Sequence, residues 1–228
     1  MSGLLKDADR HAESAGRHGK RQPRPVIALG PGVFIEASYG GHKAIPGKYH
    51  FALKVGDKKV ETDAQILANP LYPTGAPAYE EFHAVMSGME RELTAMHQLV
   101  KSLYEQQKQL EAVLAALPSG DRYAAAKRDG EAVLQKLKAW DGDMIQRRSG
   151  AYDDVENFPN RFTANYLFLI NQTESDLPRV TQPSRDRLAE LNAEWSKLKA
   201  RADELTAKEI PALNRQLWEL GVGAIWKK

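Results

Sequence analysis

The sequence predicts an α+β protein that is mostly α. We expect a small partial antiparallel β-sandwich or hairpin unit, followed by an antiparallel four-helix bundle with heptad packing. Two observations support this fold class. Apolar and polar residues alternate within residues 44–62, AIPGKYHFALKVGDKKVET, whereas apolar residues recur at steps of three and four after about Pro77. A period of two is typical of a strand with one buried face, and the longer steps are typical of helices packed in a bundle.

Composition excludes several functional classes. The chain has 228 residues with 32 basic and 30 acidic side chains, so its net charge is +2 and no general attraction to nucleic acid or anionic membrane is expected. It has no cysteine, which excludes disulfides, thiolate catalysis and cysteine-ligated metals. No apolar run approaches the ~18 residues of a membrane span, so none is predicted.

Residues 1–24 are polar and basic, and we interpret them as a disordered leader. They contain no apolar core of a signal peptide. A nucleic-acid or membrane tail and a misassigned start are the alternatives. No aromatic residue lies among the basic ones to stack on bases, so nucleic acid is not the expected partner.

Residues 25–68 form the predicted β-unit. Two short apolar runs in residues 25–40, separated by Gly30-Pro31-Gly32, predict one or two short strands. The next strand places Tyr49, Phe51, Leu53 and Val55 on one face, and Gly56-Asp57 forms a two-residue turn. The return strand has one apolar and one charged face, whose residues are Val60, Thr62, Ala64 and Ile66, and Lys59, Glu61 and Asp63.

This β-unit is incomplete by the count of its strands. An isolated hairpin is marginal in water, and an immunoglobulin-type sandwich needs about seven strands. The apolar face of the hairpin therefore requires a cover, which residues 25–40, the start of the first long helix or another molecule could supply.

A proline-rich linker at 69–77 leads to the predicted helical bundle at 78–221, and residues 222–228 are the tail. The first helix, 78–117, would be on the order of 60 Å long and is expected to project beyond its partners or bend. The other main helices are predicted near 122–146, 160–174 and 184–207. Ser119 or Asp121 is expected to cap the second helix, and Pro211 to mark a break and the first turn of a short last helix. The predicted seams are Met89, Leu93, Met96, Val100, Leu103, Gln107, Leu110, Leu114 and Leu117; Tyr123, Ala126, Gly130, Val133, Leu137, Trp140 and Met144; Phe162, Tyr166, Leu169 and Thr173; and Leu188, Leu191, Trp195, Leu198, Ala202 and Leu205.

No catalytic, cofactor-binding or metal-binding residue is predicted. His83 and His97 share a helix but lie about 21 Å apart, too far to bind one metal. Nucleophile-elbow, phosphate-loop and dinucleotide motifs are absent. Asp153, Asp154, Glu156 and Asn157 could hold Ca²⁺, but they lack the spacing of a calcium loop. We interpret the helical carboxylates as a solvated face, namely Glu90, Glu92, Asp141 and Asp143. Trp226 is expected either to be exposed or to dock on the bundle.

Taken together, the hairpin and the last helices resemble the C-terminal region of bacterial sortilin-like proteins, which carry BNR-repeat β-propellers and are described as glycosyl-hydrolase-like or sialidase-like. The resemblance covers roughly residues 40–221. It depends on a Pro-Gly-x-Tyr hairpin and on the late motifs L-x-x-E-W and E-I-P-A-L-N-x-x-L-W-E-L-G. The matched positions are Pro46, Gly47, Tyr49, Glu194, Trp195, Pro211, Ala212, Leu213 and Asn214.

The resemblance implies a hairpin that closes a β-sandwich following a propeller, and an extracytoplasmic location. The chain departs from the family in lacking the S-x-D-x-G-x-x-W boxes of propeller blades and the aromatic strand before the hairpin. Glycosidase chemistry would lie in the propeller, so no catalytic residue carries over.

Two functional hypotheses follow. The first is a non-catalytic accessory or assembly module, with a protein partner, a neighbouring propeller or a second copy bound through the helices. The second is a part of a glycan-acting hydrolase whose catalytic propeller is not in this chain.

Overall fold

The computed structural model describes residues 27–28, 34–35, 40–149, 154, 157–174 and 179–226. It confirms an α+β fold that is mostly α, with an antiparallel hairpin followed by four main helices. The elements in chain order are β1 (Ile27–Ala28), β2 (Phe34–Ile35), β3 (Gly47–Val55), β4 (Lys58–Ile66), α2 (Ala76–Ala116), α3 (Asp121–Met144), α4 (Phe162–Thr173), α5 (Gln182–Glu204), the π-helical segment η2 (Leu205–Glu209) and α6 (Ile210–Glu219).

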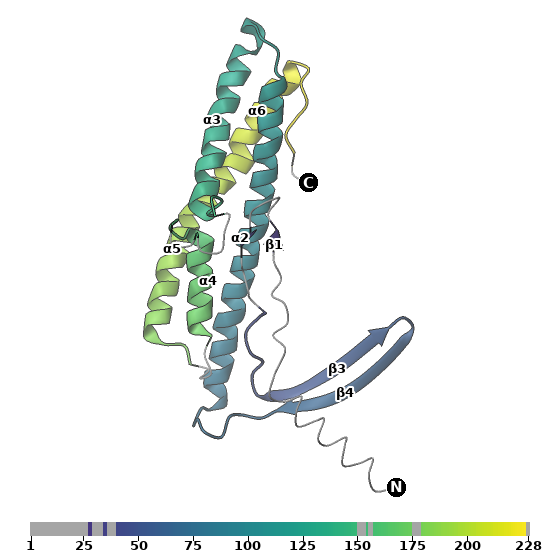
Figure 1. Cartoon of the computed structure of the whole chain (residues 1–228), viewed down its shortest axis with the longest axis vertical. Helices are drawn as coiled ribbons and strands as arrows, with labels where there is room; N and C mark the ends of the chain where they lie inside the picture. Colours follow the sequence, from purple (N-terminus) through teal and green to yellow (C-terminus); the bar gives the residue numbers. More distant parts are fainter. Residues whose placement is uncertain are drawn as a thin grey trace.

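The 41-residue helix α2 runs the length of the helical part (Figure 1). It was expected to project beyond its partners or to bend, but other helices lie along both of its halves. Helix α3 lies along its C-terminal half and α4 along its N-terminal half, while α5, η2 and α6 run past both as one helical course. Two shorter helices placed end to end therefore cover one long one.

The predicted seams form the core. On α2 the seam residues from Met89 to Leu110 are buried, including Gln107, whereas Leu114 and Leu117 are partly buried near the end of the helix. The seams of the other helices are also largely buried, among them Trp140, Tyr166 and Leu191. The heptad pattern therefore identified the inward-facing residues correctly.

Helix α2 begins at Ala76, so Pro77 occupies its first turn, where the missing N–H of proline costs no helical hydrogen bond. The cap expected for α3 is wrong. Gly120, with φ of 133°, precedes the helix, and neither Ser119 nor Asp121 supplies a side-chain cap. Pro211 lies in the first turn of α6, as expected, but the expected break before it is absent. The π-helical turn of η2, in which the N–H of Ile210 donates to the carbonyl of Leu205, continues the course into α6.

A largely buried ion pair lies at the C-terminal end of α3. Arg147 donates to both carboxylate oxygens of Asp141 at 2.6 and 2.7 Å, and its guanidinium stacks 3.9 Å from the centre of the Tyr104 ring on α2. The interpretation of Asp141 as part of a solvated face is therefore wrong, because its partner follows the helix and folds back onto it. The other helical carboxylates are bonded too: Glu90 to His42, Glu92 to the Trp195 indole, and Asp143 to Arg201.

The described part of the tail docks on the bundle. The side-chain amide of Asn214 both donates to and accepts from the backbone of Ile225, at 2.6 and 2.8 Å, and Gln109 binds the backbone of Trp226 in the same way. Ile225 is buried, whereas the Trp226 side chain is exposed. Among the helices within the described residues, none is both long and apolar enough to cross a bilayer.

Candidate functional site

The hairpin formed by β3 and β4 is a two-stranded ribbon with two different faces, and it extends away from the bundle (Figure 1). Its register pairs Tyr49 with Ala64, Phe51 with Thr62 and Leu53 with Val60, across a turn in which Gly56 has φ of 58°. Directly opposed residues point to the same side of a sheet. The predicted apolar and charged faces are therefore both present.

The apolar face is open to solvent. The exposed fractions of Phe51, Leu53, Val55 and Val60 are 53%, 65%, 66% and 67%. Strands β1 and β2 do appear in residues 25–40, but they pair with each other in a separate sheet and not with the hairpin. Two of the three predicted covers therefore fail within the described residues, since neither these strands nor the start of α2 buries the face.

The opposite face carries a small charge network. Both ring nitrogens of His50 face carboxylates, Nδ1 at 2.8 Å from Asp63 and Nε2 at 3.1 Å from Glu61. The hydrogen bond to Asp63, with a smaller contribution from Glu61, raises the pKa of His50 above its usual value. The Lys59 ammonium, followed by His50, lowers the pKa of Glu61. The two acids of β4 are thus already paired within the hairpin.

The charge network around His50 makes the stability of the hairpin depend on pH. Because the folded hairpin holds the proton of His50 more tightly, its stabilising contribution is present below the ordinary histidine pKa and is lost as pH rises through the raised value. In an NMR titration of the imidazole, the pKa of His50 in the parent chain should lie above the pKa of His50 in the Asp63→Asn variant. His97, whose pKa is lowered by burial, serves as the internal comparison. A titration of His50 below that of His97 would contradict the assignment.

The hairpin is attached to α2 by a histidine cluster at its root. His42, in the segment that leads into β3, donates to Glu90 from its backbone N–H and from Nδ1, at 2.9 and 2.7 Å. Its Nε2 lies 2.7 Å from Nδ1 of His83, and its ring packs edge-on against Phe82. Tyr49 closes the root by donating its hydroxyl to the carbonyl of Ile45 at 2.6 Å.

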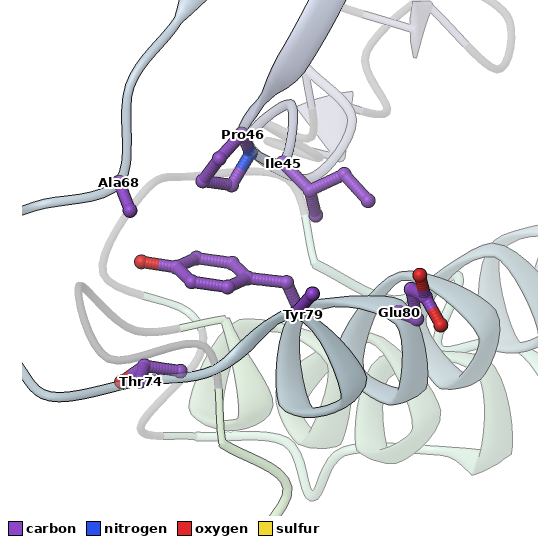
Figure 2. A pocket seen from close by; sticks show the side chains of 7 residues that line it. Ile45, Pro46, Ala68, Thr74, Tyr79 and Glu80 are labelled. Atoms are coloured by element: carbon purple, nitrogen blue, oxygen red, sulfur yellow. The ribbon is translucent and has the colours of Figure 1, made fainter.

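A small pocket lies beside this root (Figure 2). The Tyr79 ring lies between Ile45 and Pro46 on the hairpin side and Thr74 on the other, and Ala68 closes one edge. Its volume of about 170 Å³ is below the ~300 Å³ at which ordinary small-molecule sites begin. We therefore assign it to the junction between hairpin and helix and not to a ligand site.

The structure also places the residues weighed as ligands. His83 and His97 remain apart along α2, but His83 meets His42, a contact across 41 positions that no sequence motif indicated. Asp154 and Asn157 bond to each other, while Asp153 and Glu156 lie outside the described residues. No group of three potential metal ligands occurs in the described part of the chain. The leader at 1–24 likewise lies outside it.

Comparisons with known proteins do not extend this assignment: no family model, no curated protein and no solved structure matches the chain.

Proposed function

We propose that the chain is a non-catalytic interaction module whose hairpin becomes part of a partner's β-structure. The observation that supports this function is the exposed apolar face of β3 and β4, with Phe51, Leu53 and Val60 each more than half exposed. The helix seams, by contrast, are occupied within the chain. The hairpin, more than the helices, therefore offers the surface for assembly.

The size of this face indicates the kind of contact. Two nine-residue strands, at ~3.3 Å per residue and ~4.8 Å apart, present roughly 300 Å². A stable complex buries about 800 Å² on each partner. The face alone is too small, so the partner must also contact the edges or the far side of the ribbon. Incorporation into a β-sandwich meets this requirement, and the sequence resemblance to sortilin-like proteins favours the sandwich that follows their propeller.

The experiment mixes the full chain with a propeller-plus-sandwich fragment of a sortilin-like protein that lacks its own closing hairpin. Size-exclusion chromatography with light scattering should detect a complex. The variant Phe51→Ser/Leu53→Ser should lose it at unchanged helical circular dichroism, and Trp218→Ser, at another exposed aromatic, should retain it. A chain that stays monomeric with the fragment, or a complex indifferent to the Phe51 and Leu53 changes, would refute the proposal.

A second candidate is a supporting part of a glycan-acting hydrolase. It rests on the same resemblance, and the chemistry would belong to the propeller. Hydrolysis of chromogenic glycosides by the fragment, with and without this chain, separates the two. Activity that requires the chain favours the hydrolase, whereas a complex without activity favours the accessory module.

A further inference from the structure

From the charges of the hairpin we infer that its partner, under the function proposed above, supplies an acidic amphipathic β-strand that pairs with the outer edge of β3. In the described residues, β3 pairs with β4 alone, so its other edge presents backbone N–H and C=O groups. Such an edge is a template for strand addition, which supplies main-chain hydrogen bonds that the small apolar face lacks.

The two strands differ in charge. β3, GKYHFALKV, has no acidic residue, and its polar face carries Lys48, His50 and Lys54. Lys48 and Lys54 are exposed and make no ion pair in the described part of the chain. The acids of β4 are taken by His50 and Lys59, and Lys54 lies directly opposite Lys59. The polar face of β3 therefore keeps two uncompensated lysines, whereas Lys58 of β4, likewise unpaired in the described residues, lies on the apolar face opposite Val55.

This charge argues against a second copy as the occupant. An antiparallel β3–β3 contact centred on Phe51 sets Lys48 against Lys54 of the other copy twice, and any other β3–β3 register also lacks an acid. Like charges directly opposite each other on a sheet are destabilising. Pairing β3 with the β4 of another copy is a head-to-tail contact, which builds a ring or an open filament and not a closed dimer.

The positions of the lysines on β3 determine which residues the partner's strand must carry. Lys48 and Lys54 are six positions apart on one side of β3, roughly 20 Å at ~3.3 Å per residue. A complementary strand has acidic residues at that spacing on one side, and on the other side apolar residues that extend the face of Phe51 and Leu53. Opposite charges then meet in cross-strand pairs, and the apolar surface becomes three strands wide.

The test uses two fluorescein-labelled nine-residue peptides of alternating valine and serine, with glutamate at the second and eighth positions in one and lysine in the other. Anisotropy with the full chain should show the glutamate peptide binding at least tenfold more tightly. Lys48→Glu/Lys54→Glu should reverse this preference, and Lys58→Glu, a lysine on the apolar side of β4, should preserve it. Hydrogen exchange should slow at β3 amides.

Equal affinity of the two peptides, no binding at millimolar concentration, a preference unaffected by the Lys48 and Lys54 changes, or protection at β4 would each overturn the inference. These outcomes are distinct from failure of the proposed function. A complex with the propeller-plus-sandwich fragment that depends on Phe51 and Leu53 but not on the two lysines would preserve the module and reject the acidic strand.

Discussion

Replacing Arg147 by alanine should lower the free energy of unfolding by about 3 kcal/mol, because it leaves a buried carboxylate without its partner. Asp141 is largely buried and receives two hydrogen bonds from Arg147, whose guanidinium also covers the Tyr104 ring. Lysine cannot reproduce the two-pronged geometry or the stacking, so Arg147→Lys should recover little of the loss. Urea denaturation followed by circular dichroism measures both variants.

The matched control for Arg147 is Arg201, which pairs with Asp143 at 2.7 Å in a half-exposed setting. Arg201→Ala should cost less than about 1 kcal/mol, as exposed ion pairs usually do. Adding Asp141→Asn to Arg147→Ala should restore part of the stability by removing the unpaired charge. Equal losses for the Arg147 and Arg201 variants would show that burial of the first pair has no energetic consequence.

Replacing Trp140 by alanine should lower the free energy of unfolding by about 3–5 kcal/mol, as much as the Arg147→Ala change or more. Trp140 is fully buried on α3, and its indole N–H donates to the carbonyl of Leu198 on α5 at 2.8 Å. The substitution creates a large cavity and removes the hydrogen bond between α3 and α5. Thermal and urea unfolding should both shift.

Two further variants serve as comparisons: one separates the packing of Trp140 from its hydrogen bond, and the other is a control at an exposed tryptophan. Trp140→Phe keeps most of the packing and removes the hydrogen bond, so about 1–3 kcal/mol should be lost. Trp218→Ala, at a side chain that is 77% exposed, should stay within about 0.5 kcal/mol of the parent. A Trp140→Phe loss as large as that of Trp140→Ala would mean that the hydrogen bond, and not the buried volume, dominates.

Local pattern was sufficient to predict the helices, their inward faces and the hairpin register. Residues such as Met96, Leu137 and Trp195 follow a heptad spacing that specifies burial whatever the neighbour is. The end-to-end placement of α3 and α4 could not be read in this way, because it depends on which half of α2 each helix selects. Nor could the sequence indicate that Arg147 turns back onto Asp141.

At the candidate site, too, the sequence predicts the local pattern but not the contacts between distant segments. Alternation along β3 identifies Phe51 and Leu53 as one face, but a period of two carries no information on what covers that face. The histidine cluster escaped prediction because His42 meets His83 and Glu90 only after the chain has completed the hairpin. The acidic residues of β4 are visible in the sequence. Their pairing with His50 and Lys59 is not, because it depends on the strand register and the side-chain rotamers.

The junction pocket has a consequence for how such a protein can change in evolution. Ile45, before β3, and Ala68, after β4, line the same small pocket against Tyr79, so the chain departs from the bundle and returns to it at one place. The ribbon is therefore modular. Mutation can lengthen, shorten or recharge it while the heptad core of the bundle remains as it is, and new recognition specificities can arise without a new scaffold.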